Sequence, residues 1–129
     1  MGMSWLSLIT VAALIEYFAF VLLTGQARLK YNVQAPATTG DPVFERHYRV
    51  QQNTLEQLII FIPSLWLFAE YVGPRSAFVL GLLFIIGRAI YAMGYVREPA
   101  QRRAGAIATF AANGILLIGS LIGLLVRAL

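Results

Sequence analysis

Long apolar segments separated by short polar connections are the feature that most constrains the fold of this chain. Four such segments can be distinguished, at about Met3–Leu23, Leu58–Val72, Ala77–Tyr95 and Gly105–Leu125. A bilayer core about 30 Å thick needs a helix of ~20 mostly apolar residues. The second segment is too short alone, so the polar stretch Arg46–Gln57 must complete its helix. Because lipid offers the backbone no hydrogen-bond partners, we expect an all-α integral membrane protein with a single domain over residues 1–129, an antiparallel bundle of four transmembrane helices.

Composition agrees with this interpretation and excludes several kinds of site. The 129 residues are 59% hydrophobic and 12% charged, which is too apolar for a soluble domain of this size. The absence of cysteine excludes disulfides, thiolate metal sites and a cysteine nucleophile. A single histidine, His47, excludes a histidine cluster for zinc, so we expect no metal.

The net charge of +4 is distributed in a way that predicts membrane orientation. The first connection carries Arg28, Lys30, Arg46 and Arg49, the third carries Arg97, Arg102 and Arg103, and the second carries only Arg75. The positive-inside rule then places the first and third connections in the cytoplasm and both termini outside. If the source is bacterial, the membrane is the inner one. Cations gathered at helix ends do not form a nucleic-acid-binding face, so no nucleic acid partner is expected.

Polar side chains continue into the membrane on two neighbouring helices. At 100° per residue they form two stripes, Arg49, Asn53 and Glu56 on the second helix and Arg88, Tyr91 and Tyr95 on the third. Arg88 and Glu56 are predicted at similar depth, where an ion pair would offset the cost of two lone charges. Two stripes at one depth predict a polar cavity, and an excess of cations over carboxylates predicts an anionic ligand rich in hydrogen-bonding groups.

Three stretches carry the pattern of a known family. They read "PATTGDP" (36–42), "FERHYRVQQNTLEQ" (44–57) and "RAIYAMGYVREPAQR" (88–102). With these stretches the chain resembles, over nearly its whole length, the MAPEG superfamily of membrane-associated proteins in eicosanoid and glutathione metabolism. The nearest pattern is that of the branch containing leukotriene C synthase and the microsomal glutathione transferases. The resemblance implies four-helix subunits assembled as homotrimers in a lipid bilayer, with glutathione bound between adjacent subunits at the cytoplasmic side.

The same resemblance implies a set of site residues. Glutathione would be bound by Arg28, Arg49, Gln51, Asn53, Glu56, Tyr91 and Tyr95. Arg102 matches the arginine that holds the thiol sulfur, with its neighbour Arg103 as the alternative. A guanidinium beside the sulfur favours the thiolate, which is the nucleophile. At Gln57 the sequence departs from the family, which often has tyrosine directly after the motif glutamate.

Three functions are compatible with the sequence. The first is an enzyme that conjugates glutathione to lipophilic electrophiles or reduces lipid hydroperoxides, with a lipophilic substrate arriving through the bilayer. The second is a non-catalytic, lipid-binding scaffold of the same superfamily. The third, less favoured, is a small four-helix proton-coupled exporter, for which the intramembrane Glu16 is the main support. As a structural alternative for Glu16, we expect a hydrogen bond to Asn113, at matching depth on the fourth helix.

Overall fold

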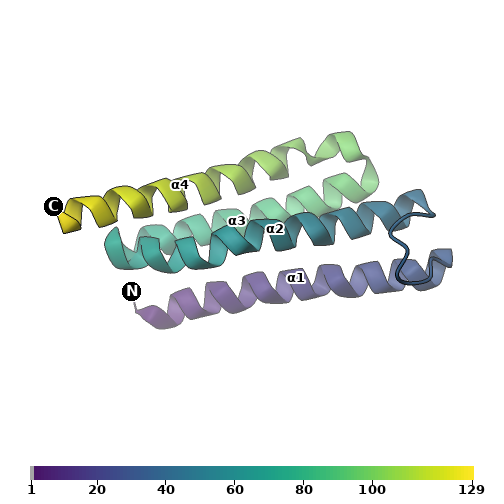
Figure 1. Cartoon of the computed structure of the whole chain (residues 1–129), viewed down its shortest axis with the longest axis horizontal. Coiled ribbons are helices and arrows are strands. Elements are labelled where there is room, and N and C mark those ends of the chain that lie inside the picture. The colour runs from purple at the N-terminus through teal and green to yellow at the C-terminus, as the bar shows by residue number, and fades with distance from the viewer. Residues whose placement is uncertain (1) are drawn as a thin grey trace.

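The computed structural model describes residues 2–129 and consists of four long helices and one short turn of 3-10 helix. The elements are α1 (Met3–Tyr31), α2 (Pro42–Tyr71), α3 (Pro74–Arg97), η1 (Pro99–Arg102) and α4 (Arg103–Ala128). The helices lie side by side, and both termini lie at the end that also holds the α2–α3 connection (Figure 1). The α1–α2 loop and η1 lie at the opposite end. The predicted all-helical fold is therefore confirmed.

The first helix is longer than the sequence predicted. α1 continues from the apolar segment through polar residues to Tyr31, and it ends at Asn32, a left-handed residue with φ 55°. Asn32 tolerates this conformation, and its backbone N–H donates to the Arg28 carbonyl. The connection to α2 is consequently shortened to residues 32–41.

The second helix begins with a strong N-terminal signal. Asp41 accepts hydrogen bonds from the backbone N–H groups of Val43 and Phe44, and Pro42 occupies the first turn. The helix then runs without interruption from Pro42 to Tyr71. This confirms that the polar stretch and the following apolar segment form one helix.

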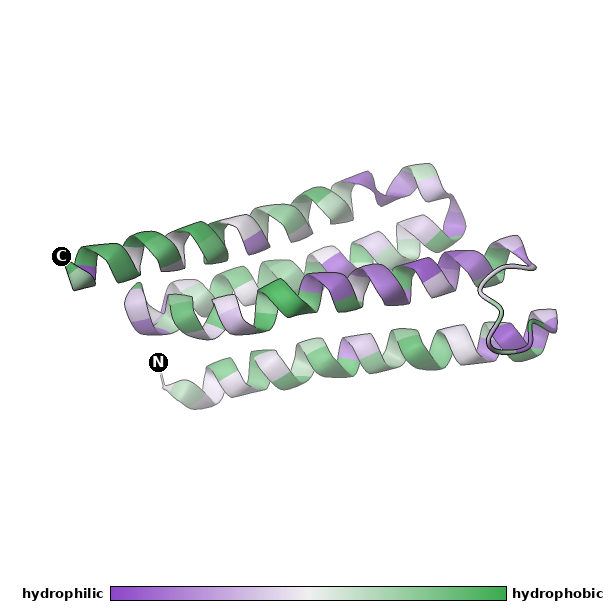
Figure 2. Cartoon of the chain, in the orientation of Figure 1, coloured by the Kyte–Doolittle hydropathy of each residue, from purple (hydrophilic) through white to green (hydrophobic). Residues whose placement is uncertain are grey.

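Three parts of the chain are long and apolar enough to cross a membrane: Met3–Tyr31, Pro74–Arg97 and Pro99–Ala128. The first half of α2 is hydrophilic, as Figure 2 shows, and this half lowers the hydropathy of the whole helix. The hydrophilic half lies at the same end as the α1–α2 loop and the start of α4 (Figure 2). Polar side chains from separate elements are thus brought to one end of the bundle.

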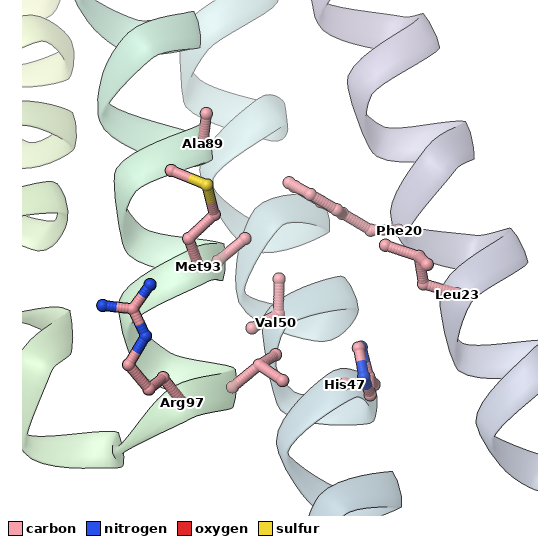
Figure 3. A pocket seen from close by; sticks show the side chains of 9 residues that line it. Phe20, Leu23, His47, Val50, Ala89, Met93 and Arg97 are labelled. Atoms are coloured by element: carbon pink, nitrogen blue, oxygen red, sulfur yellow. The ribbon is translucent and has the colours of Figure 1, made fainter.

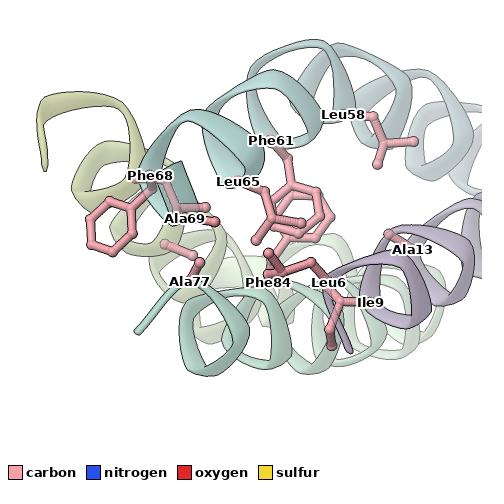
Figure 4. Close-up of a cluster of buried hydrophobic side chains, with 12 residues drawn as sticks. Leu6, Ile9, Ala13, Leu58, Phe61, Leu65, Phe68, Ala69, Ala77 and Phe84 are labelled. Atoms are coloured by element: carbon pink, nitrogen blue, oxygen red, sulfur yellow. The ribbon is translucent and has the colours of Figure 1, made fainter. Parts of the chain in front are cut away.

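The apolar core occupies the other half. Buried side chains of α1, α2 and α3, including Leu6, Leu65 and Phe84, meet there (Figure 4). The rings of Phe61 and Phe84 stack with their centroids 3.9 Å apart. α2 and α3 are central: α1 packs against both of them, and α4 also packs against both. Two grooves result at the polar end, one beside α1 and one beside α4.

Glycines allow α3 and α4 to approach closely beside the second groove. A Cβ on Gly105 would lie 2.5 Å from the Tyr91 Cα and 2.6 Å from the Gly87 carbonyl oxygen. A Cβ on Gly87 would lie 2.9 Å from that of Ala108. Only residues without a side chain fit this crossing, as is common for helices packed in lipid. The crossing fixes Tyr91 relative to the start of α4.

Candidate functional site

A polar pocket of about 310 Å³ lies between α2, α3 and α4 at the polar end of the bundle. It is lined by Arg49, Asn53, Gln57, Arg88, Tyr91, Tyr95, Arg102, Ala106, Thr109 and Phe110. All of the predicted α3 stripe and, except for Glu56, the predicted α2 stripe line this pocket. Five of the eight predicted site residues meet in it: Arg49, Asn53, Tyr91, Tyr95 and Arg102. The lining holds three arginines and no carboxylate.

Helical periodicity explains the contribution of α2. Its pocket residues Arg49, Asn53 and Gln57 recur every four positions and so share one face. Val50 and Thr54, each one position further on, are buried at 2% and 0% exposure and fix the rotation of the helix. At about 1.5 Å per residue, Gln57 lies ~12 Å deeper along the helix than Arg49. The pocket therefore extends from a rim at Arg49 to a floor at Gln57.

Arg88 is the most deeply buried charge near the pocket, with 1% exposure. Its Nη2 donates to the Thr54 hydroxyl at 2.8 Å and its Nη1 to the Thr109 hydroxyl at 3.4 Å. The guanidinium carbon lies 4.2 Å from the centre of the Tyr91 ring. The Nε atom is buried without a hydrogen-bond partner. Arg88 thus joins three helices while part of its hydrogen-bonding capacity stays unused.

The predicted ion pair between Arg88 and Glu56 is wrong. Glu56 lies 4.0 Å from Arg49 instead, and both of these side chains are more than half exposed. The reason is rotational, because Thr54 faces α3 and Glu56 is 200° further around α2 at 100° per residue. The sequence argument compared the depths of the two residues but not the directions in which their side chains point.

Tyr95 and Arg102 form the rim near the α3–η1 connection. The rings of Tyr91 and Tyr95 stack with centroids 5.6 Å apart, and the Arg102 guanidinium lies 5.9 Å from the Tyr95 ring centre. Arg102 Nη1 donates to the Pro99 carbonyl at 2.9 Å, which holds the side chain over η1. Arg103 lines a neighbouring pocket of about 390 Å³, which Arg102 also lines, but it does not reach the polar pocket.

A further arginine stabilises this end of the bundle. Arg46 Nη1 donates to the carbonyls of Val96 and Arg97, at 3.1 and 3.3 Å. These carbonyls end α3, where the helix leaves acceptors unpaired and carries negative partial charge. Arg46 therefore ties α2 to the end of α3 beside the rim.

Three predicted site residues lie outside the pocket of this chain: Arg28, Gln51 and Glu56. Arg28 donates to the Ala37 carbonyl at 2.7 Å and lies over the Phe44 ring, so it belongs to the α1–α2 side of the bundle. Gln51 follows Arg49 by two positions and so lies on a different face of α2.

Sequence reasoning missed Gln57 and Thr109 as lining residues. Asn113 Nδ2 donates to the Gln57 side-chain oxygen at 2.9 Å and to the Gln57 backbone carbonyl at 3.2 Å. The predicted hydrogen bond between Asn113 and Glu16 is therefore wrong, since α4 packs against α2 and α3 and Asn113 turns to α2. The Oε1 atom of Glu16 is buried without a hydrogen-bond partner. Gln57 could have been identified as a lining residue from its position four residues after Asn53, which places both on one face of α2.

A second, apolar pocket of about 450 Å³ lies on the other side of α2 and α3, next to α1. Figure 3 shows Phe20 and Leu23 on one wall, Met93 and Arg97 on the opposite wall, and Val50 between them. The His47 side chain also lines this pocket, and its backbone carbonyl accepts from the Thr24 hydroxyl at 3.2 Å. Its lining offers few polar groups, in contrast to the pocket beside α4.

Fold and pocket together define an all-helical membrane protein with a cation-rich, hydrogen-bonding cavity at one end of its bundle. The chain belongs to the MAPEG family, whose model matches residues 6–122.

Three relatives show the branch of the family that this chain is similar to. An uncharacterized protein of Synechocystis sp. is 46% identical over 121 residues, which cover 94% of this chain and 88% of that protein. Microsomal glutathione S-transferase 2 of Homo sapiens is 39% identical over 120 residues, with coverage of 93% and 80%. Leukotriene C4 synthase of Cavia porcellus is 34% identical over 124 residues, with coverage of 96% and 83%.

Proposed function

We propose that this protein is a membrane-bound, glutathione-dependent enzyme that activates the glutathione thiolate. The thiolate would be conjugated to lipophilic electrophiles or would reduce lipid hydroperoxides. The observation that carries the proposal is the polar pocket, which gathers Arg49, Asn53, Tyr91, Tyr95 and Arg102 from three elements beside lipid-facing helices. The similarity to a glutathione transferase supports glutathione as the co-substrate.

The pocket lining fits the charges of glutathione. The tripeptide carries two carboxylates and one ammonium group, and the lining offers three guanidinium groups with two tyrosines. Arginine binds carboxylates well because its planar fork can donate two parallel hydrogen bonds. The three guanidinium groups and the absence of carboxylates from the lining leave a cationic pocket, which the two carboxylates of the peptide would partly neutralise. Glu56, beside Arg49 at the outside, would be the partner of the ammonium group.

Arg102 is assigned to the sulfur. Its guanidinium lies at the rim, over Tyr95, where the polar pocket adjoins the neighbouring pocket of about 390 Å³ that Ile107 and Phe110 line. A positive charge there lowers the pKa of the bound thiol and raises the thiolate fraction at neutral pH. In conjugation, the sulfur lone pair would form a bond to an electrophilic carbon, and the electron pair of the broken bond would leave with the leaving group or, in an opened epoxide, stay on the oxygen, which takes up a proton. In hydroperoxide reduction, the thiolate would take the terminal oxygen and release the alcohol, and a second glutathione would convert the resulting sulfenic acid to glutathione disulfide and water.

We further propose that the four helices span the membrane in an antiparallel arrangement and that three chains assemble around shared sites. The first and third connections would face the cytoplasm, and both termini would face outside. Arg28 and Gln51, which lie outside the pocket of their own chain, would each complete the pocket of a neighbouring chain. This explains why residues of one predicted site occupy different faces of one subunit.

The test is the ultraviolet absorbance of the thiolate when glutathione is added to the purified protein in detergent. We expect a stoichiometric thiolate signal near neutral pH, followed by consumption of glutathione when a lipophilic electrophile is added. Glutathione binding without a thiolate signal would favour the non-catalytic scaffold. No glutathione binding would remove the proposal altogether and reopen the exporter interpretation of Glu16.

A further inference from the structure

The apolar pocket beside α1 is a groove on the side of the bundle opposite the polar pocket. Its volume is about 450 Å³, and none of its lining residues lines the polar pocket. Val50 and Ala92 are buried at its floor, whereas Leu23 on α1 and Met93 on α3 are exposed at its walls (Figure 3). The groove is therefore separate from the site proposed for glutathione, and its occupant is a question beyond the proposed function.

Small side chains on α3 leave the space for this groove. The lining residues of α3 recur at intervals of three and four positions and so share one face: Ala89, Ala92, Met93, Val96 and Arg97. From Ala89 to Arg97 the groove follows α3 for ~12 Å, at about 1.5 Å per residue. The Thr24 hydroxyl donates to the His47 carbonyl at 3.2 Å and ties α1 to α2 beside it. The result is a long, narrow apolar space, the shape that an extended acyl chain fills.

The groove runs from the membrane surface into the hydrocarbon region. The helix that forms one of its walls, Pro74–Arg97, is long and apolar enough to cross a membrane. Arg97 is the last residue of that helix, so it lies where the span ends, and Ala89 lies about two turns deeper. In a bilayer the molecules next to such a groove are lipids, with headgroups at the level of Arg97 and acyl chains at the level of Ala89.

Positive charge gathers at the mouth of the groove. Arg97 is exposed, and no carboxylate of residues 2–129 lies within 4.0 Å of its guanidinium. Figure 3 shows its side chain directed along α3 towards Met93, as expected from the lean of helical side chains towards the N-terminus. Arg46 Nη1 donates to the Val96 and Arg97 carbonyls, which places a second guanidinium beside the first. The mouth is therefore complementary to an anion, and the body of the groove to a hydrocarbon chain.

We propose that this groove binds one acyl chain of an anionic phospholipid and that Arg97 and Arg46 bind its phosphate. Arginine suits this role because its planar fork can donate two parallel hydrogen bonds to phosphate oxygens. The apolar lining alone gives little preference, since the surrounding lipid tails are equally apolar. The guanidinium groups supply the selectivity for a net negative headgroup, and the chain fills the space that Ala89 and Ala92 leave between α1 and α3.

The experiment is photolabelling of the purified full-length protein in detergent. The probes are phosphatidylglycerol and phosphatidylcholine, each with a diazirine in one acyl chain, and mass spectrometry of peptides locates the label. We expect phosphatidylglycerol to label the groove segments 20–23 and 89–93 about fivefold more than phosphatidylcholine does at equal concentration, and unlabelled phosphatidylglycerol to compete. The measurement needs no glutathione, so its result is independent of the proposed function.

Two variants test the two halves of the site. Arg97→Gln changes an exposed side chain and should reduce the preference for phosphatidylglycerol to near one, while Arg103→Gln, at the same end but beside α4, should keep it. Ala89→Leu fills the groove and should abolish labelling of segments 20–23 and 89–93 by both lipids. Ala111→Leu, the matched substitution at an exposed position of α4, should leave that labelling unchanged.

Three results would overturn the proposal. The first is label spread evenly over the exposed apolar faces of α1 and α4, which would indicate unselective surrounding lipid. The second is a preference for phosphatidylglycerol that Arg97→Gln leaves unchanged. The third is stronger labelling of the groove by a diazirine fatty acid than by phosphatidylglycerol, which would assign the groove to a free carboxylate lipid instead.

Discussion

The Thr54 hydroxyl lies 2.8 Å from Nη2 of Arg88, and this hydrogen bond joins α2 to α3 at a point where neither residue is exposed. The Thr109 hydroxyl continues the connection to α4 at 3.4 Å. The deepest arginine of the polar pocket is therefore also a structural link among three helices. Replacing Arg88 would alter both the pocket lining and this link, so its hydroxyl partners are the better positions to test first.

Thr54→Val should destabilise the protein. Valine keeps the shape of threonine but leaves a guanidinium N–H without a partner in a site with 0% exposure. Hydrogen bonds to charged groups contribute about 1.5–3 kcal/mol, so we expect a loss of that order in the free energy of unfolding. The measurement is unfolding by SDS titration in mixed micelles. Thr54→Ser retains the hydroxyl and should lose clearly less; equal losses for serine and valine would show that the methyl group, not the hydrogen bond, matters.

Arg102→Ala should lower turnover much more than glutathione binding. Without the rim guanidinium the pKa of the bound thiol rises, so a smaller fraction is thiolate at neutral pH and the pH profile of turnover shifts upward. Each unit of pKa shift costs about tenfold in thiolate below the pKa. The measurement is thiolate absorbance and turnover against pH at saturating glutathione.

Two other arginines serve as comparisons for Arg102. Arg75→Ala, at the opposite end of the bundle, should leave the pH profile unchanged. Arg103→Ala should have little effect because this side chain does not line the polar pocket. A larger effect from Arg103 than from Arg102 would transfer the sulfur contact to Arg103.

Gly105→Ala should disturb both packing and binding. The added methyl group would meet the backbone of Tyr91 and the Gly87 carbonyl, so α3 and α4 must separate and Tyr91 must move. Gly114→Ala is the matched control on α4, because nothing lies within 4 Å of its Cβ position. That control should be neutral or should stabilise the helix by up to about 1 kcal/mol. Thermal unfolding and glutathione affinity measure both effects, and an unaffected Gly105→Ala variant would contradict the close crossing.

The sequence was sufficient to predict the helices and, for several residues, the face of the helix on which the side chain lies. Asn53, Tyr91 and Tyr95 line one pocket, as regular spacing along their helices indicated. The partners of Arg88 and Asn113 were not predictable in this way, since each depends on how two helices are rotated against each other. Gly87 and Gly105 allow α3 and α4 to approach closely, and this effect emerges only when the helices are packed.

The end of α1 shows a second limit of pattern reasoning. Apolar content ends near Leu23, but the helix continues to Tyr31 because neither glycine in a strained conformation nor proline interrupts it. Hydropathy therefore identifies the part of a helix that lies in lipid, whereas capping residues such as Asn32 determine where the helix ends.

The last prediction concerns the assembly of the site from two chains. Arg28 belongs to the α1–α2 side of its own chain, away from the pocket that Arg102 lines. If a neighbouring chain supplies Arg28, then Arg28→Ala and Arg102→Ala subunits, each nearly inactive alone, should complement each other when they are assembled together. In a random 1:1 mixture, about one quarter of the interfaces would pair an intact Arg28 with an intact Arg102, so turnover should recover to ~25% of the unmodified protein.

The control for this mixture is a pair of variants on one pocket, Arg102→Ala mixed with Tyr95→Phe, because both residues line the pocket of the same chain. In that mixture each site has one defect or the other, so turnover should equal the average of the two pure variants. If turnover of the mixed Arg28→Ala and Arg102→Ala protein exceeds the average of these two pure variants, each site is shared between chains. Only a pocket built from two chains can be restored by mixing. Turnover that stays at the average of the pure Arg28→Ala and Arg102→Ala proteins would place Arg28 either outside the site or within the same chain's pocket.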